Sequence, residues 1–130
     1  MIVDSSALMA VLYDEPGRAW VRKRISEATR VQIGAPTLLE TEIVLCSQLG
    51  PAGRGMLLGL VRAAGLQVIP FEPEHARLAG DAFLRYGKGR HPAALNFGDC
   101  MTYAVARHSH EPLLFVGDDF PHTDLELVAS

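Results

Sequence analysis

Acidic side chains stand at several points where a short apolar run ends or a helical stretch begins. They are Asp4, Glu40, Asp99, Asp118 and Asp119. Taken singly, each has an ordinary structural explanation, because acids cap helices, favour the first helical turn and are common in turns. Taken together they suggest chemistry, because carboxylates that share one crevice repel each other unless cations neutralise them. Hard oxygen ligands suit Mg²⁺ or Mn²⁺, and such an ion, open to water, is suited to phosphodiester hydrolysis.

Short apolar runs alternate along the chain with longer stretches of helical periodicity. The runs expected to be buried strands of a parallel sheet are Met1–Val3, Val31–Ile33, Gln67–Ile69 and Leu113–Val116. Helices are expected over residues 5–13, from 17 through 25, and over 36–49, 53–64, 73–86 and 97–108. Strands that alternate with helices predict an α/β layered fold with a mainly parallel sheet.

The parallel sheet decides whether the acids meet. In such a sheet the carboxyl ends of all strands, and the starts of the following helices, lie on one edge. Asp4, Glu40 and one of the acids Asp118 and Asp119 are therefore expected to converge there. Asp99 stands in the first turn of a helix, so it joins them if that helix starts on the same edge. The sequence thus predicts a metal-dependent site that cleaves phosphodiesters.

Glu42 competes with Glu40 for a place in this site. On a helix with 100° per residue, Glu42 projects into an apolar arc, whereas Glu40 lies near the polar side. The arc consists of Leu38, Leu39, Ile43, Leu45, Cys46 and Leu49. A buried Glu42 would need a partner or the wet edge of a pocket, so periodicity alone leaves both acids open.

A segment broken by glycines and a proline gathers basic side chains shortly before Asp99. These side chains are Arg85, Lys88, Arg90 and His91. One interpretation is an ordinary solvated loop, and the other is a basic lip that grips phosphates beside the acidic crevice. The five histidines show no metal-ligand spacing, so they are expected at the surface or at helix caps.

Composition narrows the class of protein. A chain of 130 residues with 48% apolar and 21% charged residues predicts one folded domain over residues 1–130 and excludes a disordered protein. The net charge of −3 argues against a protein that coats nucleic acid. Cys46 and Cys100 lack metal-ligand spacing and are expected to be reduced core thiols. With no signal peptide and no long apolar stretch, a soluble cytoplasmic protein that does not enter membranes is expected.

Three segments of the chain resemble the PIN-domain nucleases. The segment Met1–Leu8, MIVDSSAL, looks like their opening strand and helix. The segment Tyr86–Cys100, YGKGRHPAALNFGDC, closely resembles a segment typical of VapC-type toxins, the ribonuclease halves of bacterial toxin–antitoxin pairs. Pro112–Phe115 followed by Gly117–Phe120 resembles the end of their last core strand. The resemblance implies a PIN-like three-layer fold, with a twisted sheet of four to five strands flanked by helices.

The resemblance also implies roles for the acids. Asp4 and Asp99 match the family's principal metal ligands, and the stretch TLLE that ends at Glu40 matches its helix glutamate. Glu40 is therefore preferred to Glu42. The fourth acid follows less directly, because many family members have an aspartate at the position of Gly117. The neighbouring acids at 118 and 119 are left to fill that role, and Asp118 is preferred.

Family activity implies endonucleolytic cleavage of RNA that depends on Mg²⁺ or Mn²⁺. The implied partners are an RNA substrate, contacted by Lys88, Arg90 and Arg85, an antitoxin whose tail blocks the active-site groove, and a second copy of the chain. The alternative is a catalytically degenerate PIN domain that serves only as a protein-binding scaffold. Retention of all four acids argues against that alternative.

Overall fold

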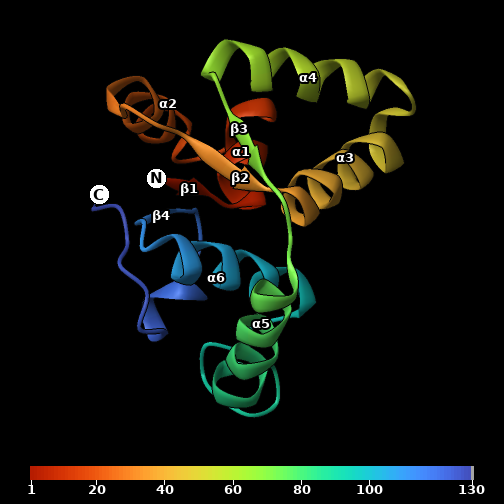
Figure 1. Cartoon of the computed structure of the whole chain (residues 1–130). Coiled ribbons are helices and arrows are strands. Elements are labelled where there is room, and N and C mark those ends of the chain that lie inside the picture. Colours follow the sequence, from red (N-terminus) through yellow and green to blue (C-terminus); the bar gives the residue numbers. More distant parts are fainter. Residues whose placement is uncertain (130) are drawn as a thin grey trace.

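The computed structural model describes residues 1–129 as a four-stranded parallel sheet between two helical layers (Figure 1). The strands are β1 (Ile2–Val3), β2 (Gln32–Gly34), β3 (Gln67–Ile69) and β4 (Leu113–Leu114). Their order across the sheet is β3-β2-β1-β4, and every neighbouring pair is parallel. The predicted α/β fold with a parallel sheet is confirmed, and β1 lies in the interior of the sheet.

The helices agree closely with the stretches expected from the sequence. They are α1 (Ser5–Leu12), α2 (Arg18–Glu27), α3 (Ala35–Leu49), α4 (Ala52–Ala64), α5 (Pro73–Tyr86) and α6 (Phe97–Ser109), with a 3₁₀ turn at Phe120–His122. The agreement has a local cause, because the ends carry clear signals. Asp4 and Asn96 cap α1 and α6 with their side chains, and Gly50 ends α3 with a positive φ of 68°.

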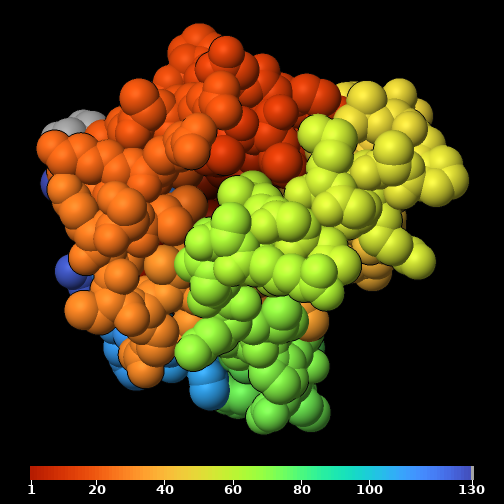
Figure 2. Space-filling view, turned by 90° about the horizontal axis from the view of Figure 1, so that it is seen from above, coloured from red at the N-terminus to blue at the C-terminus, as the bar shows by residue number. Residues whose placement is uncertain are grey.

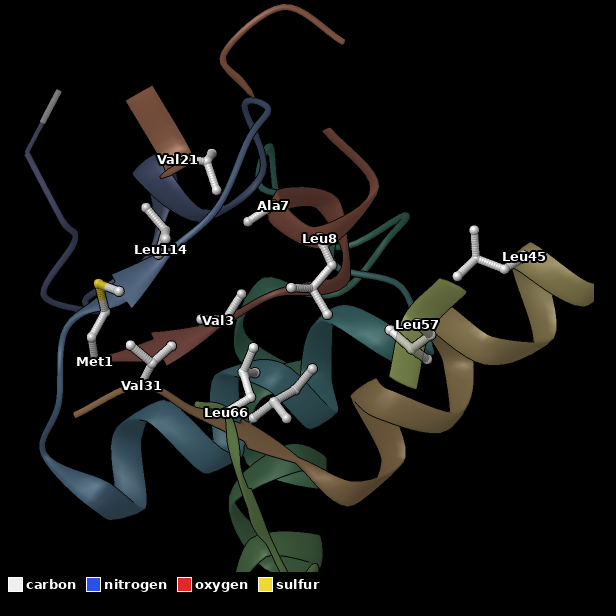
Figure 3. Close-up of a cluster of buried hydrophobic side chains, with 11 residues drawn as sticks. Met1, Val3, Ala7, Leu8, Val21, Val31, Leu45, Leu57, Leu66 and Leu114 are labelled. Carbon is white, nitrogen blue, oxygen red and sulfur yellow. The ribbon is translucent and has the colours of Figure 1, made fainter. Parts of the chain in front are cut away.

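Alternate residues of the central strands feed two hydrophobic clusters. Val3 and Leu114 face the layer formed by α1, α2 and α4, whereas Ile2 and Leu113 face the layer formed by α5 and α6. Figure 3 shows the first cluster, in which Val3 of β1 lies between Leu8 of α1 and Val31, the residue before β2. Each fully buried side chain of this size contributes about 1.5–3 kcal/mol. Packing on both faces holds β1, and with it the residue that follows it, in a fixed position.

The third expected strand is present but is not buried. Val68 of β3 is 46% exposed, because β3 is an edge strand that pairs with β2 alone. A short apolar run has the same appearance in the centre of a sheet and at its edge, so the sequence did not distinguish the two. Within residues 1–129, no helix is long and apolar enough to cross a membrane.

The histidines were expected at the surface or at helix caps. His75 takes part in the N-terminal cap of α5, but its side chain is buried. Its Nδ1 accepts a hydrogen bond from the backbone N–H of Glu72 at 2.9 Å, at the start of α5. The side chain is 3% exposed and stacks on Phe71, with the ring of His108 4.5 Å away between centroids. Burial, and next the neighbouring His108, lower the pKa of His75, against the smaller opposite effect of Glu72 and Glu74.

We therefore predict that the contribution of His75 to stability is lost as the pH falls below about 6.5, whereas the raised pKa values of Asp99 and Glu40 act in the opposite direction. The folded state prefers neutral His75, so its contribution is present above the unfolded pKa of about 6.5 and is lost as the pH falls through the lower folded pKa. Protonation also removes the Nδ1 acceptor from the cap. Thermal unfolding at several pH values should show a flatter profile for His75→Gln, since glutamine caps without titrating. The exposed His122→Gln is the control, and an equal flattening there would contradict the assignment.

Candidate metal centre

Asp4 lies at the point where β1 passes into α1, and both of its carboxylate oxygens are hydrogen-bonded. Oδ2 accepts from the backbone N–H of Ser6 at 3.1 Å, which makes Asp4 the N-cap of α1. Oδ1 accepts from the hydroxyl of Thr102 at 2.8 Å. The residue is 4% exposed. The helix-capping role and the predicted ligand role are therefore compatible, because each oxygen keeps a free lone pair.

Asp99 occupies the third position of α6 and forms a reciprocal capping box with Asn96. Its backbone N–H donates to Asn96 Oδ1 at 2.9 Å, and its Oδ2 accepts from the Asn96 N–H at 3.1 Å. Burial raises the pKa of Asp99 to about 6, and the charges of Asp4, Asp119 and Glu40 add to the rise, while the hydrogen bond from Asn96 opposes it. Acids from the start of α1, from α3 and from the turn after β4 thus add their negative charge at the Asp99 carboxylate on α6.

Glu40 reaches this cluster from the second turn of α3. Burial raises the pKa of Glu40 and the charge of Asp4 adds to it, whereas a hydrogen bond from the Ser5 side chain opposes the rise. The carboxylate lies directly against Gly98, where an added Cβ would come 2.1 Å from Oε2. Only glycine leaves room for the Glu40 carboxylate at that position of α6.

Glu42, the competing acid, lies elsewhere. Its Oε1 accepts a hydrogen bond from Arg54 Nε of α4 at 3.1 Å, and its Oε2 accepts one from the same guanidinium at 3.4 Å. The apolar arc into which it was expected to project is itself partly exposed, with Leu39 at 54% and Ile43 at 58%. Glu42 is therefore the ion-pair partner of a neighbouring helix, and the structure brings Glu40 to the acids instead.

The turn after β4 presents both Asp118 and Asp119 to solvent. Asp119 is among the charges that raise the pKa of Asp99, and Asp118 is not. Asp119 therefore adds to the negative charge at Asp99, and the choice of Asp118 made from the sequence stays a prediction. Gly117 has a φ of +126°, which L residues rarely adopt, so an aspartate there would be strained.

The three basic residues expected to contact RNA differ in their surroundings. Arg85 forms an ion pair with Asp124 at 3.4 Å and lies over the ring of Tyr86. Arg90 Nε donates to the carbonyl oxygen of Leu84 at 3.3 Å, and Lys88 is exposed. Arg85 is thus committed to an ion pair, whereas the charges of Lys88 and Arg90 remain available to an anion.

The donor set fits a divalent cation. Within residues 1–129, no lysine or arginine forms an ion pair with Asp4, Glu40, Asp99 or Asp119, so the clustered negative charge has no paired counter-ion there. Carboxylate oxygens are the ligands that Mg²⁺ and Mn²⁺ prefer. In the described part of the chain no three acidic, histidine or cysteine side chains are spaced to hold an ion as they stand. Coordination by three of the acids therefore requires side-chain rotation, for which the exposed Asp119 has the most freedom.

Sequence reasoning missed the neighbours that support the acids. Thr102 lies three residues after Asp99 on α6, and Gly98 immediately precedes that acid. Helical spacing alone could have placed Thr102 on the same face as Asp99, because residues three apart are neighbours. Which acid it contacts depends on how α6 packs against β1.

The comparisons with known proteins show the family and the fold of the chain. The family model described as the PIN domain matches residues 1–126. Ribonuclease VapC36 of Mycobacterium tuberculosis is 51% identical over 127 residues, which cover 97% of this chain and 91% of that protein. Ribonuclease VapC of Mycolicibacterium smegmatis is 41% identical over 98% of this chain and 99% of that protein. The crystal structure of M. tuberculosis VapC20, described as a Sarcin-Ricin loop cleaving toxin, superposes with a TM-score of 0.79 at 16% identity, covering 99% of this chain and 98% of that chain.

Gly98→Ala should weaken metal binding without destabilising the fold. Alanine within a helix usually stabilises it by about 0.5–1 kcal/mol relative to glycine, but here the new Cβ would push the Glu40 carboxylate aside. We expect an unchanged or higher melting temperature together with weaker Mn²⁺ binding in calorimetry. Gly59→Ala on α4, where nothing lies within 4 Å, is the matched control and should leave Mn²⁺ affinity unaltered. Normal Mn²⁺ affinity in Gly98→Ala would mean that the position of the Glu40 carboxylate is unimportant to the site.

Proposed function

Because the chain belongs to the PIN-domain family and, within it, to the VapC ribonucleases, we propose that it is a metal-dependent endoribonuclease and the toxin of a toxin–antitoxin pair. The observation that carries the proposal is the set of carboxylates around Asp99, whose pKa they raise together with burial to about 6. Such a cluster, without a protein counter-ion, destabilises the fold by charge repulsion unless a cation is bound. A scaffold that only binds proteins and holds no cation would bear the cost of that repulsion without any compensating interaction.

In this mechanism the side chains hold and orient the reacting groups. Asp4 and Asp99 would bind a divalent ion, with Glu40 and Asp119 completing the set. When bound, the ion would polarise the scissile phosphate and lower the pKa of a water molecule. Glu40, whose own pKa is raised, lies where it can accept a proton from an attacking water or orient that water. Hydrolysis would proceed by in-line attack on phosphorus with loss of the 3′ oxygen, and no residue needs to form a covalent intermediate.

Mg²⁺ or Mn²⁺ is the ion proposed for this site. Ribonucleases of this family generally depend on a divalent metal, and the donors here are all carboxylate oxygens. Zinc would favour histidine or cysteine ligands. Cys100 follows Asp99, but it is buried and burial raises the pKa of its thiol, which keeps it protonated.

Carboxamide variants of the acids provide the main test. Asp4→Asn, Asp99→Asn, Glu40→Gln and Asp119→Asn should each reduce Mn²⁺-dependent cleavage of labelled RNA by roughly 100-fold or more, because a bound metal supplies several kcal/mol of transition-state stabilisation. The neighbouring acids Glu42→Gln and Asp118→Asn are matched controls and should stay near the wild type. If the wild-type protein leaves the RNA whole when Mn²⁺ is added, the scaffold alternative is correct. A greater loss of cleavage activity in Glu42→Gln than in Glu40→Gln would mean that Glu42, and not Glu40, serves the metal site.

RNA binding is proposed for the segment between α5 and α6. Lys88 and Arg90 lie there with their charges outside strong ion pairs, a few residues before Asp99. Arg85 belongs to the same group by sequence, but its pairing with Asp124 leaves it a smaller role. Cations in such a segment position the phosphate backbone without reading the bases.

Replacing Lys88 and Arg90 together with alanine should weaken RNA binding and leave the chemical step intact. Each phosphate of a single strand that is no longer neutralised reduces the slope of log affinity against log salt by about 0.7, so the slope of the double variant should be shallower by roughly one unit. Turnover at saturating RNA should stay close to normal. Lys23→Ala with Arg24→Ala, which removes the same charge from α2, is the control. Collapse of turnover with an unchanged salt slope would contradict a phosphate clamp.

The surface of this chain has a cleft that would fit an apolar segment of an antitoxin partner. A cavity of about 660 Å³ lies between α2 and the end of α4, and its lining includes Leu12, Ile25 and Leu60 together with the basic residues Arg18 and Arg22. Figure 2 views this face and shows the orange α2 and the yellow-green α4 on either side of a hollow with red α1 at its base. We propose that the antitoxin binds here through apolar and acidic side chains, and that its tail covers the acidic site.

We also propose that the chain forms a homodimer, because apolar side chains are exposed on another part of its surface. Phe97 is 80% exposed at the start of α6, and with Phe71, Phe83 and Met101 it lines an apolar cavity of about 400 Å³. Exposed aromatic side chains of this kind are enriched in protein interfaces. A second copy bound on this face would contact the start of α6, the helix that carries Asp99.

A further inference from the structure

Buried threonine hydroxyls lie beneath the acidic cluster. Thr37 and Thr102 are 2% and 1% exposed, and their hydroxyl oxygens lie 3.1 Å apart. The Thr102 hydroxyl donates to Asp4 Oδ1 at 2.8 Å. A hydroxyl has a single proton, so Thr102 must accept from Thr37. The hydrogen bonds therefore run in one direction, from Thr37 through Thr102 to the carboxylate of Asp4.

This hydroxyl relay connects the three elements that carry Asp4, Glu40 and Asp99. Thr37 precedes Glu40 by three residues on α3, and Thr102 follows Asp99 by three residues on α6. The relay ends at Asp4, between β1 and α1. Threonine has a branched Cβ that restricts its χ1 rotation, and both hydroxyls are buried and hydrogen-bonded, which limits their movement. Rotation of the Asp4 carboxylate is thus coupled to the packing of α3 against α6.

We propose that Thr102, supported by Thr37, is a positioning residue that fixes the Asp4 carboxylate for metal binding. The proposal rests on the metal-dependent function proposed above. With Oδ1 held by Thr102 and Oδ2 held by the Ser6 N–H, the carboxylate has one orientation, and its remaining lone pairs are free for a cation. Hydrogen bonds in a chain strengthen one another, so Thr37 increases the effect of Thr102 on the carboxylate.

The relay also supplies the donors that a buried carboxylate needs. Burying a carboxylate is costly unless its oxygens are hydrogen-bonded or paired with a cation, and Asp4 is 4% exposed. Loss of the Thr102 hydroxyl would leave Oδ1 without its protein donor and Thr37 without its acceptor. Both effects act on the ability of Asp4 to bind a cation before any RNA is present.

Thr41 provides a matched control on the same helix. It is fully buried, and its hydroxyl donates to the backbone carbonyl oxygen of Thr37 at 2.8 Å. It therefore resembles Thr37 in residue type, helix and burial, but it makes no hydrogen bond to the relay hydroxyls or to an acid within residues 1–129. Thr41→Val should change stability alone.

The test of the relay is the affinity of the full chain for Mn²⁺ in the absence of RNA. It is measured by calorimetry and by electron paramagnetic resonance, which reports the concentration of free Mn²⁺. Outer partners of metal ligands are typically worth 10–100-fold in affinity, so Thr102→Val should weaken Mn²⁺ binding by about 10-fold or more. Thr102→Ser should restore most of the affinity, because it keeps the hydroxyl. Thr37→Val should cause a smaller loss, and none in addition to Thr102→Val, because Thr37 acts through Thr102.

Each outcome of this experiment has a distinct meaning. If the wild-type protein binds Mn²⁺ and Thr102→Val binds it equally well, the relay proposal is overturned while the proposed function stands. If Thr41→Val weakens Mn²⁺ binding as much as Thr102→Val, the effect is general loosening and the relay proposal is also overturned. If the wild-type protein binds no Mn²⁺, the proposed function fails and the relay proposal fails with it. Should Thr102→Val not fold, Thr37→Val and Thr102→Ser decide the question by the same measurement.

Discussion

Repulsion between carboxylates at one edge of the sheet is the constraint on which the rest of the structure depends. Asp4, Glu40 and Asp99 come from different elements, and their mutual repulsion helps to raise the pKa values of Glu40 and Asp99, so holding them together costs stability. The surrounding structure opposes this cost with rigid supports. Asp4 and Asp99 each take part in a helix cap, and Glu40 lies against a glycine that leaves room for it. A loosely packed scaffold would let the acids move apart.

The same supports explain why the site can be read partly from the sequence. The positions of Asp4 and Asp99 follow from local signals, because each stands at the boundary of an element that its own side chain helps to define. Parallel pairing then brings strand ends to one edge whatever the details of packing. The choice between Glu40 and Glu42 could not be made by periodicity, because it depends on Arg54 of a different helix. The family resemblance supplied the preference for Glu40.

Features that depend on a single turn or on distant packing were not predictable. Asp118 and Asp119 are adjacent, and how each of them lies relative to Asp99 depends on the conformation of the turn, in which Gly117 has a positive φ. The exposure of β3 depends on its position at the edge of the sheet, which no local pattern records. His75 looked like one of five similar histidines, and its burial arises from packing against Phe71 and His108.

The net negative charge of the protein raises the question of how the site attracts RNA. With 12 basic and 15 acidic residues, the chain would repel RNA at long range, and several of its arginines are held in ion pairs. In the proposed function, attraction for RNA comes from two local sources, the exposed cations near Lys88 and a divalent ion between the acids. The second source changes the sign of the local field, since carboxylates that repel phosphate become, with a cation among them, a site that attracts it. RNA affinity in such a protein is therefore coupled to metal binding, and the residues that hold Asp4 in place act on both.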